Sequence, residues 1–304
     1  MTDRPLTIGT RGSQLALWQA GFIKDIINRT QLGAVEIRII KTEGDRIDNV
    51  SFDKMEGKGF FTKEIEDALL AGEIDLAVHS LKDLMTVQPD GLKLGAVGYR
   101  ADKRELLLIR REATTGKGML PVKAGGVIGT SSARRRCQIA HHNPDLTIRD
   151  LRGNVPTRVG KLREGQYDAI IIAYAGVLRL EMDLSDLTAL PLDPEKFLPA
   201  PAQGILGLQI RADDARTEAV VSQLGSKEAA IEAELERGLL ARFDSGCSLP
   251  LGVCSGVEAD NLRLKAVLGI RDNDGWDGLR RVDITGTDRK QVVDDAYDQL
   301  QGKG

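Results

Sequence analysis

The sequence has few aromatic residues and little cysteine. Phe, Trp and Tyr make up 4% of the 304 residues, so the cores must be mostly aliphatic. The same shortage argues against a base-stacking surface for nucleic acid. The three cysteines, Cys137, Cys247 and Cys254, are an odd number and form no CxxC pair. This argues against a disulfide framework and indicates a reducing compartment.

Long apolar runs and a strong excess of one charge are also lacking. No stretch is long enough to span a bilayer, and the first residues hold no apolar core of signal-peptide length. The formal net charge of −3 does not suggest a nucleic-acid or membrane partner. We therefore predict a cytoplasmic protein. Its length favours about two domains, with three small ones as the alternative.

Strand and helix patterns alternate through the first part of the chain. Short apolar runs predict strands over 6–10, 35–40 and 74–80. Helical spacing of apolar residues predicts helices over 13–30 and 61–72. This alternation predicts an α/β protein with parallel βαβ units.

Two pairs of segments are similar to each other. "VIGTSSARRRCQIA" (127–140) matches "TIGTRGSQLALWQA" (7–20), and "LREGQYDAII" (162–171) matches "LLAGEIDLAV" (69–78). Either match alone is a common strand–turn–helix pattern. Because both occur in the same order, we predict two related α/β domains.

The remainder of the chain has a different character. The proline-containing "FLPAPAQG" (197–204) suggests a linker, followed by one more strand and two helices up to residue 243. Three alternating segments then predict antiparallel strands. Residues 288–302 predict a closing amphipathic helix with Asp288 as its cap. These elements predict a third, smaller α+β domain.

Polar and basic residues follow several of the predicted parallel strands, where open α/β sheets usually bind ligands. The first such turn holds Arg11 and Ser13. The equivalent turn of the second repeat holds Thr130, Ser132, Arg134 and Arg135. Amides at a helix start together with guanidinium groups favour an anion. The alternative is that the hydroxyls cap helices and the arginines are solvated.

Further charged residues stand beyond other strands. Arg152 and Arg158 follow one strand, Arg179 follows the next, and Lys82 and Asp83 follow the strand that ends in "HS". So many cations at strand ends suggest a cleft for a polyanion. Asp83 could pair with Lys82, or it could act as an acid–base group.

Cys247 lies in the turn-like stretch "DSGCSLPLG" (244–252), between a helix pattern and a strand pattern. Cys137 lies in a predicted helix beside three arginines, which could lower its pKa and make it a competitor in reactivity. Cys137 and His141 have metal-ligand spacing, but no further ligand completes a site, so no metal is predicted. The loop at 44–60 has glycines without the spacing of a phosphate-binding loop.

These motifs together resemble the porphobilinogen deaminase family. The match runs in the family's order through "TRGSQLALWQA", "GKGFFTKE", "DLAVHSLKD", "GTSSARRRCQ", "LRGNVPTR", "DAIIIAYAGVLRL", "LPAPAQG" and "GCSLPLG". The resemblance implies two domains like those of bilobed periplasmic binding proteins, with a cleft, plus a small C-terminal α+β domain. It places domain 1 at 1–101 with 202–221, domain 2 at 102–201 and domain 3 at 222–304.

The resemblance also implies a reaction and its cofactor. Family members join four porphobilinogen molecules head to tail with loss of ammonia, and water then frees linear hydroxymethylbilane for tetrapyrrole and haem synthesis. The cofactor is a dipyrromethane held by a thioether, and the matching cysteine is Cys247. The expected partner is porphobilinogen with the growing chain, and the expected state is a monomer.

The family's functional residues map onto this sequence by motif. Asp83 is the expected acid–base residue and also a cofactor contact. The other expected cofactor contacts are Ser80, Lys82, Thr130, Ser132, Arg134 and Arg135. The expected substrate contacts are Arg11, Ser13, Arg152, Arg158 and Arg179.

This chain departs from the family pattern at Leu84, Met85, Lys103 and Ser245. None of these departures removes a charged site residue, but they can change loop stiffness. The rival hypothesis is a non-catalytic binding module, in which Asp83 and Cys247 are incidental.

Overall fold

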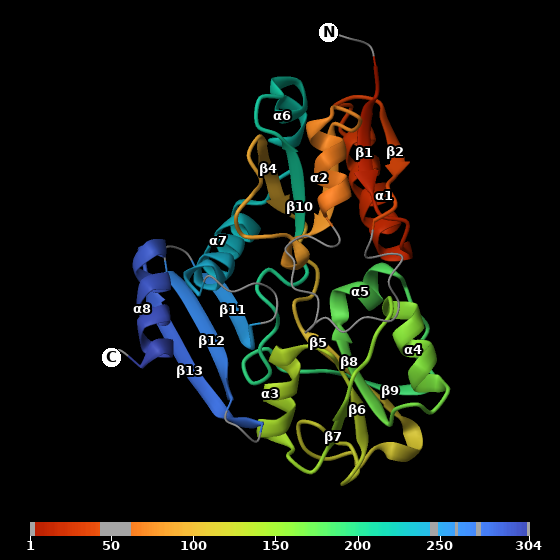
Figure 1. Ribbon diagram of the computed structural model, residues 1–304, viewed down its shortest axis with the longest axis vertical. Helices are drawn as coiled ribbons and strands as arrows, with labels where there is room; N and C mark the ends of the chain where they lie inside the picture. The colour runs from red at the N-terminus through yellow and green to blue at the C-terminus, as the bar shows by residue number, and fades with distance from the viewer. Residues whose placement is uncertain (1–3, 43–61, 244–248, 259–260, 272–274, 303–304) are drawn as a thin grey trace. The chain divides into compact units, whose positions relative to one another are not determined.

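The protein was analysed as a computed structural model that describes residues 4–42, 62–243, 249–258, 261–271 and 275–302 (Figure 1). The chain divides into two compact units. Unit 1 comprises Met1–Ala101 and Gly204–Ala233, and unit 2 comprises Asp102–Gln203 and Glu234–Gly304. Each unit is therefore built from two separate stretches of sequence.

Unit 1 contains a five-stranded sheet in the order β2-β1-β3-β10-β4. Its strands are β1 (Leu6–Thr10), β2 (Val35–Ile39), β3 (Leu76–Ser80), β4 (Leu92–Gly98) and β10 (Leu206–Arg211). Strands β1, β2 and β3 are parallel, whereas β10 is antiparallel to both of its neighbours. The helices are α1 (Gln14–Arg29), α2 (Lys63–Leu70) and α6 (Ala215–Val221).

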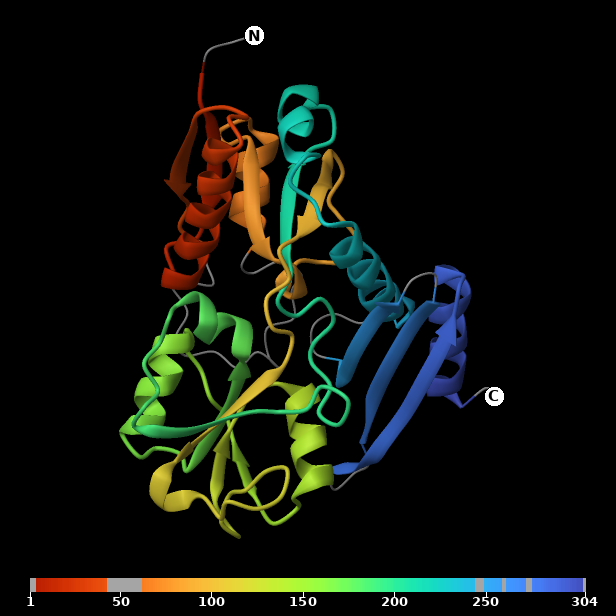
Figure 2. The same ribbon diagram turned by 180° about the vertical axis from the view of Figure 1, so that it is seen from behind.

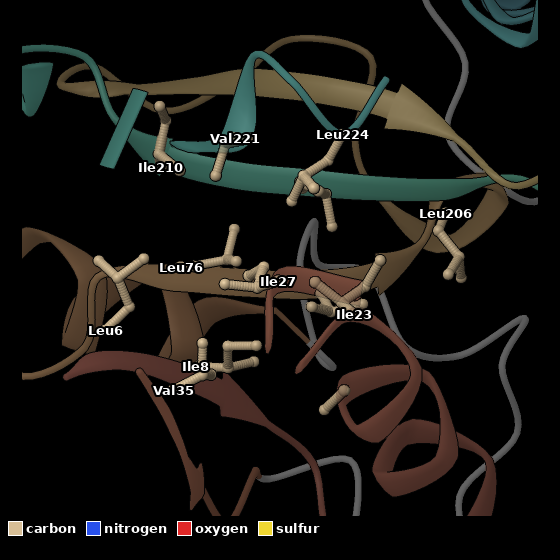
Figure 3. Close-up of a cluster of buried hydrophobic side chains, with 13 residues drawn as sticks. Leu6, Ile8, Ile23, Ile27, Val35, Leu76, Leu206, Ile210, Val221 and Leu224 are labelled. Atoms are coloured by element: carbon tan, nitrogen blue, oxygen red, sulfur yellow. The ribbon is translucent and has the colours of Figure 1, made fainter. Parts of the chain in front are cut away.

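Alternate residues of the central strands point to opposite faces of this sheet, and both faces are buried. Leu6 and Ile8 of β1 pack with Ile23 and Ile27 of α1 in one cluster, which Figure 3 shows in close-up. Ala77 of β3 instead joins a cluster on α2. The helices thus cover the two faces and leave the strand ends as the place for polar groups.

Unit 2 contains a second five-stranded sheet in the order β7-β6-β8-β5-β9. Its strands are β5 (Glu105–Arg110), β6 (Val127–Gly129), β7 (Thr147–Arg149), β8 (Ala169–Ala173) and β9 (Leu187–Pro191). Helix α3 (Ala133–His142) packs on one face, and α4 (Val155–Arg163) and α5 (Tyr174–Arg179) pack on the other.

The two five-stranded sheets have corresponding strands in the same spatial order and direction, although the antiparallel strand is the last along the chain in unit 1 (β10) and the first in unit 2 (β5). Strands β6, β7 and β8 are mutually parallel in the manner of β1, β2 and β3, and β5 is antiparallel to both its neighbours, as β10 is. The predicted relation between two α/β domains is therefore visible in the strand order. The predicted parallel βαβ units are present as β1–β3 and β6–β8. The antiparallel direction of β10 was not predicted, and strands β4, β5 and β9 were not predicted at all.

The C-terminal part of unit 2 is a three-stranded antiparallel sheet with a helix on it. The strands are β11 (Leu251–Glu258), β12 (Asn261–Arg271) and β13 (Trp276–Gly286). Helix α8 (Arg289–Gln301) lies along this sheet, as Figure 2 shows from the opposite side. Asp288 caps α8 as predicted, since its Oδ1 accepts a hydrogen bond from Gln291 N at 2.7 Å.

Helix α7 (Lys227–Arg242) precedes this sheet in the sequence. The protein is thus of the predicted class, α/β with a small C-terminal α+β part. The boundaries proposed for three domains stay a prediction.

The segment 197–204 connects the two units, as the predicted linker should, since the first stretch of unit 2 ends at Gln203 and unit 1 resumes at Gly204, but it is buried. Phe197 and Gln203 are fully buried, and the carbonyl of Leu198 accepts hydrogen bonds from Arg134 Nη1 at 2.9 Å and Gln138 Nε2 at 3.0 Å. The prolines have no backbone N–H, so their burial leaves no backbone donor at these positions that needs a hydrogen-bond partner. This stretch is consequently part of the folded core of unit 2.

Candidate active site

In unit 1 the predicted residues stand at the carboxyl ends of neighbouring strands. Arg11 and Ser13 follow β1, and Ser80, Lys82 and Asp83 follow or end β3. Since β1 and β3 pair in parallel, both turns lie at the same edge of the sheet.

Local structure fixes two of these hydroxyls. Ser13 is the N-cap of α1, and its Oγ accepts a hydrogen bond from Ala16 N at 3.3 Å. The capping interpretation is thus correct for Ser13. Ser80 Oγ accepts a hydrogen bond from Gln19 Nε2 at 2.8 Å, which ties α1 to the end of β3.

Lys82 and Asp83 lie on the short 3₁₀ helix η3 (Leu81–Asp83). The flanking Leu81 and Leu84 are buried, and Leu81 N donates to Ile205 O at 3.0 Å. These anchors hold the turn against the sheet, with Lys82 half-buried and Asp83 exposed. Asp83 is therefore open to a ligand at this edge.

A buried polar network underlies this turn. Gln209 of β10 accepts a hydrogen bond from His79 Nε2 at 3.0 Å and donates to Glu66 at 3.1 Å and to Gln88 at 2.9 Å. Gln88 donates in turn to Met85 O at 2.8 Å, so the chain after Asp83 is held as well. Burial lowers the pKa of His79 to about 4, and its hydrogen bond to Gln209 partly opposes this, so the ring is neutral at pH 7.

In unit 2 the equivalent turn follows β6. Thr130 is buried, and its Oγ1 accepts a hydrogen bond from Ser132 N at 3.2 Å at the start of α3. Ser131 Oγ bonds the backbone N and O of Leu151, each at 3.1 Å. These two bonds join the turn to the one after β7 that carries Arg152.

Arg134 and Arg135 are buried, which neither sequence interpretation anticipated. Each donates to a different oxygen of Glu105: Arg134 Nη2 to Oε1 at 2.6 Å, and Arg135 Nη2 to Oε2 at 2.8 Å. Burial lowers the pKa of Arg134, while the Glu105 carboxylate opposes that shift. Sequence reasoning gave Glu105 no role, although it ends the segment "YRADKRE" (99–105), which differs from the family pattern at Lys103.

The three remaining arginines stand on other elements of unit 2. The carbonyl of Arg152 accepts a hydrogen bond from Lys161 Nζ at 3.1 Å. Arg158 of α4 donates through Nε to Gly153 O at 2.7 Å. Arg179 ends α5 and is buried, and this burial lowers its pKa to about 10, so it stays cationic at pH 7.

The structure separates the cysteines by environment. Cys247 lies outside the described residues. Cys137 is buried on α3, and burial raises the pKa of its thiol to about 11, although Arg134 opposes the shift. Arg134 does act to lower the Cys137 pKa, as the sequence suggested, but desolvation raises it by more. The net shift is upward, so Cys137 is not the reactive competitor that the sequence left open. Cys254 is buried in β11.

The strand that follows Cys247 is firmly placed. Val253 N of β11 donates to Pro199 O at 2.9 Å, and Gly269 N donates to Pro250 O at 3.0 Å. Within the described ranges, no group of three or more His, Cys, Asp or Glu side chains could hold a metal ion. No described helix is both long and apolar enough to cross a membrane.

Two family models match the chain. One, described as "Porphobilinogen deaminase, dipyromethane cofactor binding domain", matches residues 6–219, and the other, "Porphobilinogen deaminase, C-terminal domain", matches residues 230–299. The chain belongs to the porphobilinogen deaminase family. The family's enzymes are transferases of tetrapyrrole synthesis.

Relatives named porphobilinogen deaminase are similar over most of their length. The one from Maridesulfovibrio salexigens is 40% identical over 97% of this chain and 99% of its own. The one from Nitratiruptor is 46% identical over 88% of this chain and 84% of its own. Among solved structures, an ancestral arginine-binding protein bound to arginine is 14% identical, with a TM-score of 0.41, over 73% of this chain and 91% of that one.

The residues at the strand ends fit a dipyrromethane. Each pyrrole of such a group carries an acetate and a propionate, and the site residues are arginines, a lysine and hydroxyls that match carboxylates. A buried donor is also available, since Arg135 Nε has no hydrogen-bond partner in the described part of the chain. The donor chemistry and this unsatisfied donor both suit an anionic ligand.

Proposed function

We propose that this chain joins four porphobilinogen molecules head to tail with loss of ammonia and then releases linear hydroxymethylbilane by hydrolysis. The observation that carries the proposal is the set of cationic and hydroxyl side chains at the carboxyl ends of β1, β3, β6 and β7. A bound dipyrromethane supplies the terminal pyrrole to which the first substrate is added.

The arginines and hydroxyls are proposed to bind carboxylates in both units. In unit 1 these are Arg11, Ser13, Ser80 and Lys82. In unit 2 they are Thr130, Ser132, Arg134, Arg135, Arg152, Arg158 and Arg179. Arg179 is buried and yet charged at pH 7. Its attraction for a carboxylate beside it is therefore strong, because buried surroundings screen charges little.

Asp83 is proposed to manage charge and protons at the reacting pyrrole. Loss of ammonia breaks the C–N bond at the aminomethyl carbon of porphobilinogen and leaves that carbon electrophilic. The free ring carbon of the terminal pyrrole attacks it to form the new C–C bond, and that ring carbon must then lose its proton. A carboxylate beside the ring nitrogens stabilises the positive charge of both stages and can accept that proton. Its support is the exposed position of Asp83 on η3, between two buried leucines.

Cys247 is proposed to anchor the dipyrromethane through a thioether. The burial of Cys137 and Cys254 supports this assignment, because neither thiol has room for a bulky adduct. A thioether also suits the task, since the link has to outlast each elongation and the final hydrolysis. We further propose that the protein acts as a monomer in the cytoplasm.

The intact mass of the purified protein under denaturing conditions tests the function. The expected result is an added mass of two deaminated porphobilinogen units on the intact chain, and peptide mapping should then place it on the peptide that contains Cys247. An unmodified chain that binds porphobilinogen without turning it over would favour the rival binding module.

The role of Asp83 is tested by Asp83→Asn. Turnover should fall roughly 10²–10⁴-fold, because the positioned proton acceptor is lost while the fold is kept. Asp90→Asn is the matched control, since Asp90 is also exposed and lies on the same segment. Turnover within twofold of the parent in Asp83→Asn would refute the role.

A further inference from the structure

Glu105 lies at the ligand-binding edge of the unit 2 sheet, and the comparison with the family's motifs gave it no role. It is the first residue of β5 and pairs with Ala173, the last residue of β8. Because β5 runs antiparallel to β8, the start of β5 lies at the carboxyl end of the parallel strands. Glu105 therefore stands at the edge that carries Thr130 and Ser132.

The Glu105 side chain is fully buried between the two arginines at the start of α3. Its two oxygens accept hydrogen bonds from Arg134 at 2.6 Å and Arg135 at 2.8 Å. The side chains of both arginines are 6–7% exposed. Two adjacent guanidinium groups buried to this extent would repel each other strongly without a shared carboxylate.

The charges of this group do not cancel. Two guanidinium groups and one carboxylate leave a net charge of +1. Arg134 uses a second nitrogen for Leu198 O at 2.9 Å, whereas Arg135 Nε is buried with no acceptor in the described chain. An unsatisfied donor on a net cationic group is the condition under which one further carboxylate would be bound.

We propose that Glu105 is a positioning residue for this arginine pair: it fixes both guanidinium groups and cancels one charge, which leaves a site for a single carboxylate of the dipyrromethane. This inference rests on the proposed function, in which Arg134 and Arg135 bind the cofactor. It adds to that function the residue Glu105, the net charge of +1 on the group, and the binding of one carboxylate there.

A second buried group provides a matched control. Asp75 in unit 1 is also a carboxylate between two arginines, with Arg4 at 2.6 Å and Arg211 at 3.2 Å, and its side chain is 1% exposed. It directly precedes β3, so it lies at the amino edge of its sheet, away from the candidate site. A purely structural role of Glu105 would make its variants behave like those of Asp75.

The experiment measures cofactor loading rather than turnover. Protein made in cells that lack porphobilinogen is incubated with porphobilinogen, and the fraction that gains the dipyrromethane mass is followed by denaturing mass spectrometry. Thermal unfolding is recorded in parallel. The neutralising variants are Glu105→Gln and Asp75→Asn, and the variants that change side-chain length are Glu105→Asp and Asp75→Glu.

We expect Glu105→Gln to load at least about tenfold more slowly than the parent, the loss expected for one displaced charge-assisted contact. Asp75→Asn should lower the melting temperature but load within twofold of the parent. Glu105→Asp keeps the charge and shifts it by one methylene, so loading should be slower by at least about threefold but faster than in Glu105→Gln. Asp75→Glu should load like the parent.

Two outcomes would overturn the inference. The first is a folded Glu105→Gln that loads like the parent; if this variant does not fold, parental loading by Glu105→Asp has the same meaning. The second is cofactor loading by the Asp75 variants that is slowed as much as loading by the Glu105 variants. That result would mean that Glu105 affects loading only through the stability of the fold. A parent protein that never gains the mass would instead refute the proposed function itself, and this inference with it.

Discussion

The burial of Cys137 allows a quantitative prediction of how slowly its thiol reacts. Burial raises its pKa from 9.0 to about 11, and its relative exposure is 1%. At pH 7.5 an ordinary thiol with the lower pKa is about 3% thiolate, whereas Cys137 is only about 0.03% thiolate. Its alkylation should therefore be at least about 100-fold slower than that of an exposed thiol, before steric protection is counted.

The assay is time-resolved alkylation of the folded protein with iodoacetamide at pH 7.5, followed by peptide mapping. The Cys137 peptide should stay unlabelled while a small exposed thiol in the same tube reacts to completion. In guanidinium chloride both Cys137 and Cys254 should label at the free-thiol rate.

Cys137→Ser complements this assay, because a hydroxyl can replace the thiol that donates to Arg134 O at 3.1 Å. This variant should keep its dipyrromethane. Rapid labelling of Cys137 in the folded protein, or a dipyrromethane adduct on its peptide, would refute the reasoning.

Three further predictions concern stability. The folded-state pKa of His79 is about 4 against 6.5 for a free ring, so its contribution is complete above pH 6.5 and is lost as pH falls to about 4. In urea unfolding, the free energy of unfolding of His79→Gln should fall by roughly 3 kcal/mol less than that of the parent as the pH is lowered. The same pH dependence of this free energy in variant and parent would contradict the prediction. Gly269→Ala should cost roughly 1–3 kcal/mol, because its Cβ would lie 2.7 Å from Cys137 Cβ and 2.8 Å from Cys137 Sγ. Cys137→Ala removes the Sγ contact and should recover part of that cost. Glu236→Gln should cost about 1–3 kcal/mol, since the buried carboxylate accepts from Ala202 N at 2.6 Å and Ser255 Oγ at 2.8 Å; no change in the urea midpoint would rule this out.

Local patterns predicted much of the fold because the relevant signals are local. Helical spacing located α1, and the side-chain cap of Asp288 located the start of α8. The alternating tail predicted the antiparallel β11–β13 sheet. The repeated strand–turn–helix pattern predicted two related sheets, and these have the same strand order.

Other elements lack a local signal. Leu106, Leu107 and Leu108 of β5 are all buried, because helices cover both faces of its sheet. The strand therefore has no polar–apolar alternation by which to be recognised. Nor does the sequence show that β5 and β10 reverse direction, since strand direction depends on where the chain enters each sheet.

By itself the sequence determined the family motifs and which charged residues follow the parallel strands, because the turn after a strand is encoded by its own residues. Only the tertiary structure decided what those charges meet. Glu105 is 29 and 30 residues from Arg134 and Arg135, and the sheet brings the three together. The direction of the Cys137 pKa shift likewise depends on desolvation, which comes from every element packed around the thiol and not from its neighbours in the sequence.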